Sequence, residues 1–208
     1  MPDEQTGAAA GGGFVESGAW ISVPRSTSAV AQALVLVDAQ RGFLRGEQAV
    51  PDADRLIDRC TLLLDRARAA GALIVHLRND GEPGAVDEPG SPGWQLQLPV
   101  VESDDEHVVS KEDDDGFTGT DLGALLDRRG VRSVVIGGVL SEMCVSATAR
   151  GALERGLDVV LPHDAHASYG LDDLPASVVS RVAEHALGSD PVFVQTSEAV
   201  RFTSAAAE

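Results

Sequence analysis

Cysteine, aromatic and basic residues are scarce in this 208-residue chain, and long apolar runs are absent. Two cysteines, Cys60 and Cys144, cannot build a framework of several disulfides, so we expect a reducing, cytoplasmic environment. No segment approaches the ~20 apolar residues that a membrane-spanning helix needs. Residues 1–13 have neither a basic region nor an apolar stretch, so we expect no signal peptide. These absences exclude a disulfide scaffold and a helical membrane protein.

The charge is one-sided: 33 acidic against 16 basic residues give a formal net charge of −17. Such a surface repels phosphate groups, which excludes nucleic acid and anionic membranes as partners. A cationic or neutral small molecule fits this charge better, although an acidic surface also serves solubility alone.

Hydrophobic periodicity divides the chain into an arm and one domain. Residues 1–30 are rich in Gly, Ala and Ser without a sustained period, so we expect a flexible arm. Residues 31–208 alternate between short apolar runs and 3.6-residue patterns. We expect strands at 34–37, 72–77, 107–110, 131–139, 158–161 and 191–195, and helices at 52–70, 120–129, 142–155 and 173–187. This alternation predicts an α/β fold, a three-layer α/β/α domain with a mostly parallel sheet of five to six strands.

Three chemically active side chains follow predicted strands, where ligands bind in an open parallel sheet. Asp38 ends the first strand, Lys111 follows the third, and Cys144 follows the strand over 131–139. A carboxylate can take the thiol proton, while an ammonium and a helix N-terminus stabilise the thiolate. Each residue alone is also compatible with a turn cap, a surface ion pair or core packing. Cys60, on the apolar stripe of the first helix, is assigned to the core.

Several short motifs resemble those of the isochorismatase-like cysteine hydrolase superfamily, in its order and spacing. Residues 36–43 are similar to its opening motif, residues 109–111 and 116–122 to its lysine motif, and residues 138–145 with 148–150 to its nucleophile motif. Asp164-Ala165 matches a further landmark. The resemblance covers about residues 33–195 and favours the amidohydrolase branch.

The resemblance implies a role for each strand-end residue. Asp38 matches the general base and acid, Lys111 the third member of the catalytic triad, and Cys144 the nucleophile. It also implies a cis peptide bond between Val139 and Leu140. The oxyanion hole of the family maps onto the backbone N–H groups of Leu140 and Cys144.

The sequence departs from the metal-binding nicotinamidase branch of the superfamily. Those enzymes carry an Asp-x-His pair and a further His, whereas residues 51–54 and 77–80 of this chain contain no histidine. The five histidines (His76, His107, His163, His166 and His185) show no spacing typical of a metal site. We therefore predict no metal and no organic cofactor.

A long Gly- and Pro-rich connection over residues 78–106 is expected to be functional. Phe43, Trp94 and Phe117 lie in this connection or beside the motifs, and we predict that they line the substrate pocket. Core packing is an equally good explanation for each ring. Gln40 is a further pocket candidate, or it bonds the adjacent turn.

We predict a hydrolase that cleaves a C–N bond of a small amide, carbamoyl, ureide or lactam substrate through a Cys144 thioester. The presence of the thiol favours this reaction, since isochorismatases that act on an enol ether often lack it. Streptothricin hydrolase, a lactam-opening relative with a cationic substrate, suits the acidic charge. The alternatives are an enol-ether hydrolase that uses Asp38 and a non-catalytic binding module of the same fold. Family behaviour also implies a homo-oligomer, either a dimer or a tetramer.

Overall fold

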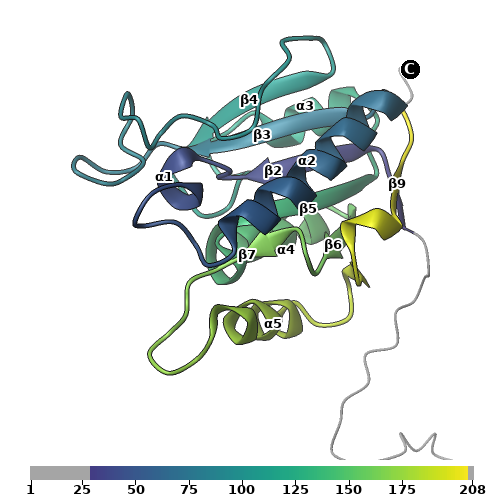
Figure 1. Ribbon diagram of the computed structural model, residues 1–208. Helices are drawn as coiled ribbons and strands as arrows, with labels where there is room; N and C mark the ends of the chain where they lie inside the picture. The colour runs from purple at the N-terminus through teal and green to yellow at the C-terminus, as the bar shows by residue number, and fades with distance from the viewer. Residues whose placement is uncertain (1–28, 206–208) are drawn as a thin grey trace, which may run out of the picture.

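A parallel β-sheet forms the centre of the structure, a computed structural model that describes residues 29–205 (Figure 1). Six strands follow one another across the sheet in the order β4-β3-β2-β5-β6-β8, and the short β7 pairs with β5. Their bounds are Ala33–Val37 (β2), Leu73–Asn79 (β3), Glu106–Lys111 (β4), Ser133–Val139 (β5), Asp158–Pro162 (β6), His166–Ala167 (β7) and Val192–Val194 (β8). Every pairing among the described strands is parallel. The predicted fold class is confirmed.

Helices cover both faces of the sheet (Figure 1). Their bounds are Arg41–Leu44 (α1), Ala53–Ala70 (α2), Leu122–Arg128 (α3), Ser146–Glu154 (α4) and Ala176–Ala186 (α5), with a π-helical turn at Ser141–Val145 (η1) and a 3₁₀ turn at Ser197–Ala199 (η2). In β2, Leu34 and Leu36 pack toward α2, while Val35 and Val37 pack toward α3 and α4. A strand covered on both faces needs this continuous apolar run.

Differences from the sequence prediction concern short elements. The helix expected over 142–155 is divided, because η1 precedes α4 and contains Cys144. Two three-residue strands, β1 (Ala29–Ala31) and β9 (Val200–Phe202), pair with each other outside the main sheet. Their length is too short for a periodic signal. The expected arm lies outside the described residues except for Ala29 and Val30, which belong to β1.

The core includes Cys60, as expected from its place on the apolar stripe. Its side chain is buried, and its Sγ lies 3.7 Å from the carbonyl oxygen of Ala165. Burial raises the pKa of the Cys60 thiol to about 12. Within residues 29–205, every helix is too short or too polar to cross a lipid bilayer.

Candidate active site

The carboxyl ends of β2, β4 and β5 bring together the three residues singled out in the sequence. Val37 of β2 pairs with both Leu77 of β3 and Gly138 of β5, and Lys111 of β4 pairs with Asn79 of β3. Asp38 follows β2 directly, and η1 follows β5 after a single residue. Neighbouring strand ends therefore deliver an acid, an amine and a thiol to one edge of the sheet.

Two backbone positions at this edge have special conformations. Asp38 adopts φ = 48°, in the left-handed region that aspartate tolerates better than most residues. Gly138 has φ = 122°, and a Cβ there would lie 1.9 Å from the carbonyl oxygen of Val37. Only glycine permits this approach of β5 to β2, which explains the glycine before the nucleophile segment.

Lys111 lies between the acid and the thiol. Its Nζ is 2.9 Å from Oδ2 of Asp38 and 3.4 Å from Sγ of Cys144. It also donates to Oδ1 of Asn79 at 3.3 Å and to the backbone oxygen of Asp113 at 3.1 Å. The Asp38 and Lys111 side chains are only 3% and 0% exposed, so solvent screens their attraction weakly.

Burial shapes the proton distribution among these three groups. Burial raises the pKa of Asp38, although the Lys111 ammonium opposes that rise. Burial by itself lowers the pKa of Lys111, but Asp38 and Cys144 raise it above its usual value. Burial and the Asp38 carboxylate also raise the pKa of the Cys144 thiol, against the opposing effect of Lys111. These shifts favour the ammonium form of Lys111 and the protonated form of the Cys144 thiol.

One neighbour of the thiol is not indicated by the sequence pattern. Cys144 lies in η1, directly before the start of α4, and its Sγ donates to Oδ1 of Asp114 at 3.3 Å. Asp114 belongs to the acidic run immediately after Lys111 and adds to the rise in the pKa of the thiol that burial and Asp38 cause. Stabilisation of a thiolate by the helix N-terminus stays a prediction.

The peptide bond between Val139 and Leu140 is cis. The carbonyl oxygen of Leu140 accepts hydrogen bonds from the N–H groups of Met143 and Val145, both at 3.1 Å. These two bonds stabilise the η1 turn. The turn contains Cys144, whose Sγ lies 3.4 Å from Nζ of Lys111.

Gln40 is fully buried and fastens the long connection to β3. Its side-chain amide donates to the carbonyl oxygens of Asn79 at 3.0 Å and of Trp94 at 3.2 Å. Its Oε1 accepts the Asn79 N–H at 2.8 Å. Gln40 thus bonds distant segments rather than the adjacent turn that was its alternative explanation, and its contact with substrate stays a prediction.

The three aromatic candidates occupy different surroundings. Trp94 is half-buried in the long connection, where its Nε1 donates to Oδ1 of Asp80 at 2.7 Å and the Arg78 guanidinium lies 3.6 Å from its ring centre. Phe43 packs against the core on the α2 face, and Phe117 is buried in the core on the opposite face. Their assignment to a pocket wall stays a prediction.

Two adjoining cavities lie near the carboxyl end of β4. One, of about 600 Å³, is lined by Lys111 together with Asp80, Ser110, Glu112, Asp113, Thr118 and Gly119. The other, of about 540 Å³, has four acidic residues in its wall: Asp80, Glu82, Glu88 and Glu112. Asp80 and Glu112 belong to both cavities, and neither Asp38 nor Cys144 lines them. The surface around the end of β4 is therefore strongly acidic.

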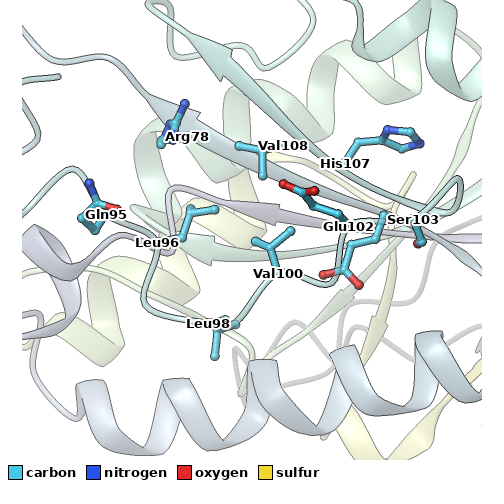
Figure 2. A pocket seen from close by; sticks show the side chains of 10 residues that line it. Arg78, Gln95, Leu96, Leu98, Val100, Glu102, Ser103, His107 and Val108 are labelled. Carbon is cyan, nitrogen blue, oxygen red and sulfur yellow. The ribbon is translucent and has the colours of Figure 1, made fainter. Parts of the chain in front are cut away.

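A separate groove of about 580 Å³ lies along the edge strand β4 (Figure 2). Figure 2 shows Leu96, Val100 and Val108 among the apolar side chains that line it, together with the polar side chains of Glu102 and His107. None of the three strand-end residues lines it, so we do not assign the chemistry to this groove. As for metals, no group of three or more His, Cys, Asp and Glu residues within 29–205 is arranged to hold an ion.

A three-layer parallel α/β/α fold with a buried acid, an amine and a thiol at its carboxyl edge defines a class of hydrolases. Residues 32–186 match the Isochorismatase domain family model, so the chain belongs to the isochorismatase family. Two streptothricin hydrolases from Streptomyces noursei are 56% and 57% identical to it over 83% and 84% of the chain. The chain covers 65% of the length of the first and 72% of the second. The crystal structure of an isochorismatase from Pseudomonas putida has a TM-score of 0.70 at 26% identity, covering 89% of this chain and 92% of that one.

Proposed function

We propose that this protein is a metal-independent cysteine hydrolase that cleaves a C–N bond of a small amide or lactam. The observation that carries the proposal is the position of Lys111 Nζ, 2.9 Å from the Asp38 carboxylate and 3.4 Å from the Cys144 thiol. Kinship with hydrolases 56% and 57% identical supports it.

In the proposed reaction, Asp38 takes the Sγ proton as the sulfur of Cys144 attacks the carbonyl carbon of the substrate. The negative charge moves to the carbonyl oxygen, which accepts hydrogen bonds from the N–H groups of Leu140 and Cys144. Collapse of this intermediate breaks the C–N bond, and Asp38 returns its proton to the leaving nitrogen. A water molecule, deprotonated by Asp38, then hydrolyses the thioester and regenerates the thiol.

Lys111 keeps its charge throughout this sequence. Its ammonium stabilises the Asp38 carboxylate before the attack and the sulfur anion as it forms. Because burial and Asp38 raise the pKa of the Cys144 thiol, we propose that the proton transfer and the attack are coupled. With this coupling, the sulfur stays a thiol, the less reactive form, until the carbonyl group of a substrate is bound.

We further propose a cationic lactam of the streptothricin type as the substrate. The two most similar relatives described above are streptothricin hydrolases. The acidic walls of the two cavities near the end of β4 and the net charge of −17 favour a cationic ligand.

The test is mass spectrometry of streptothricin incubated with the protein, where lactam opening adds one water to the substrate mass. We expect this product from the wild type and none from Cys144→Ala. A covalent acyl-enzyme adduct on Cys144 after rapid acid quenching would support the thioester. Full activity of Cys144→Ala would refute the thioester. Absence of any hydrolysed product from streptothricin and from a panel of amides and ureides would favour the enol-ether alternative, which uses Asp38 without the thiol.

A matched pair of variants tests the cationic preference. Glu88→Gln removes one charge from the acidic wall, and Glu154→Gln removes one charge from an exposed site on α4. We expect KM for streptothricin to rise several-fold in Glu88→Gln alone, with kcat unchanged in both. Equal effects of the two substitutions would contradict the proposal.

We also propose a cytoplasmic homo-oligomer. Both cysteines are free thiols, which suits a reducing compartment. Several exposed apolar side chains lie on η1, on α5 and in the segment before α5, and they are suited to contact with a second copy of the chain. They are Met143, Leu171, Leu174, Val178 and Val182. Sedimentation equilibrium of the wild type and of Val182→Glu tests this assembly.

A further inference from the structure

A second buried chain of polar groups connects the nucleophile turn η1 to α5. Ser141, the first residue of η1, is 1% exposed, and its Oγ lies 2.8 Å from Nδ1 of His166 in β7. On the other side of the ring, Nε2 of His166 lies 3.2 Å from Oε1 of Glu184 in α5. The His166 and Glu184 side chains are only 2% and 5% exposed. None of these residues belongs to the proposed triad.

Glu184 is an ionised partner for this chain. Burial by itself raises its pKa, but His163 and His166 lower the pKa of Glu184 to about 2. Nε2 of His166 and Oε1 of Glu184 are in charge contact at 3.2 Å, and neither atom has a hydrogen-bond partner among the described residues. The hydroxyl of Ser141 donates to Oγ of Ser180 at 3.0 Å and also lies within hydrogen-bond distance of Nδ1 of His166.

Other charged groups surround the same carboxylate. Arg181 of α5 and His163 both contact Oε2 of Glu184, on the side away from His166. Asp52, Arg55 and Asp164 line the adjoining cavity of about 190 Å³. The guanidinium supplies a cation to Oε2 of Glu184, and Oε1 lies on the side that faces His166.

Ser141 connects this chain of polar groups to the turn that carries the proposed nucleophile. It directly follows Leu140 and lies three residues before Cys144. Its backbone oxygen accepts the hydroxyl of Ser146 at 2.6 Å, so the same residue joins η1 to the start of α4. Its Oγ also lies 3.0 Å from the Ser180 hydroxyl of α5. Ser141 is thus tied to three elements that surround the nucleophile turn.

We propose that Ser141, His166 and Glu184 are positioning residues, which hold η1 against α5 and so fix Leu140 and Cys144 relative to Asp38 and Lys111. This inference rests on the proposed function for its kinetic readout, because misplacement of reacting groups by about 1 Å can cost about 100-fold in rate. Its structural readout, the rigidity of η1, needs no substrate.

The chain offers a matched control for a substitution in this network. His76 in β3 is another buried histidine whose Nε2 faces a glutamate, with Oε1 of Glu106 at 3.0 Å. Among the described residues its Nδ1 has no hydrogen-bond partner, whereas Nδ1 of His166 faces Ser141. A glutamine can retain the reach of Nε2 but not that of Nδ1. His166→Gln therefore cuts the link to Ser141, while His76→Gln makes the same change without such a link.

The experiment compares Ser141→Ala, His166→Gln and His76→Gln with the wild type by amide hydrogen exchange and by kinetics on streptothricin. We expect exchange over residues 140–146 to accelerate about tenfold in Ser141→Ala and His166→Gln, and to be unchanged in His76→Gln. We expect kcat to fall about tenfold in the first two variants, with KM within twofold of the wild type. His166→Asn, which keeps a polar atom near the Nδ1 position, should restore part of both losses.

Unchanged exchange over 140–146 in Ser141→Ala and His166→Gln would overturn the inference, as would an equal effect of His76→Gln or a loss confined to KM. If His166→Gln does not fold, Ser141→Ala decides alone, because it removes a single oxygen atom. A wild type inactive on streptothricin would contradict the proposed substrate, while the exchange comparison would still decide the role of this network.

Discussion

The Asp38 carboxylate and the Lys111 ammonium form a buried ion pair, with Oδ2 and Nζ 2.9 Å apart. Neither group reaches bulk solvent, so each depends on the other for charge compensation. A pair of this kind is costly to break, because one removed partner leaves an uncompensated buried charge. The effects of this pair on catalysis and on stability can be distinguished by comparing single and double variants.

Replacement of one partner should damage both properties. We expect Asp38→Asn and Lys111→Met each to lower the free energy of unfolding by about 3–5 kcal/mol. Loss of the base in Asp38→Asn should lower kcat by about 10²–10⁴-fold. Urea denaturation and steady-state kinetics measure the two effects.

The double variant Asp38→Asn/Lys111→Met supplies the control. Because it leaves no buried charge unpaired, it should regain much of the lost stability and none of the activity. Additive destabilisation by the two substitutions would mean that the pair is not coupled as the 2.9 Å distance indicates.

The pH dependence of kcat/KM should report the ionisation of Asp38. The reaction needs the Asp38 carboxylate, and burial raises the pKa of Asp38 above the usual 3.8. As the pH falls, kcat/KM should therefore decline with a midpoint above pH 3.8. Since Lys111 lowers the pKa of Asp38, removal of its charge in Lys111→Met should move this acid limb to still higher pH. A limb that stays in place or moves to lower pH would contradict the assignment of Asp38 as the base.

Gln40 should control the order of the long connection over residues 78–106. Gln40→Leu removes the donors to the carbonyl oxygens of Asn79 and Trp94 and the acceptor of the Asn79 N–H. Buried groups without partners cost about 1–3 kcal/mol each, so we expect a loss of roughly 2 kcal/mol or more. Thermal unfolding and KM measurements test this, and KM should rise as the connection loosens. The exposed Gln95→Leu in the same connection is the control and should leave both values unchanged.

Glu184 should contribute stability that depends on pH. Its pKa is lowered from 4.5 to about 2 in the folded state, so its contribution is present above pH ~4.5 and is lost as the pH falls through ~2. The size of the shift sets an upper limit of about 3 kcal/mol. We expect the stability difference between the wild type and Glu184→Gln to shrink between pH 6 and pH 3 in urea titrations. Glu154→Gln should show a difference that does not vary over this range.

The sequence predicted the fold well because its strands carry strong local signals. The continuous apolar run of β2 and the 3.6-residue stripe of α2, which includes Cys60, each specify one element by themselves. Motif order then predicted family membership, which the comparison with known sequences confirms. The same motifs led to Asp38, Lys111 and Cys144, which the structure brings into contact.

Other features depended on contacts that no local pattern encodes. Ser141, His166 and Glu184 are separated by up to 43 positions, and only the packing of α5 on η1 joins them. The pKa of the Cys144 thiol is raised by burial and by Asp38, with a smaller effect of Asp114, and its helix-like sequence pattern did not reveal this. Gln40 could be read in two ways, because a buried amide and a substrate-binding amide look alike in a sequence.

The pairing of β1 with β9 limits how far the chain can be truncated. The family match ends at residue 186, yet β8 and β9 follow it, and Val194 and Val200 are buried in the core. Ala29 lies beside Val200 in the parallel register, so the two ends of the described chain close on each other. A chain shortened to residues 32–186 would lose this closure together with the outer strand of the sheet. We therefore predict that the cooperative folding unit is larger than the matched domain.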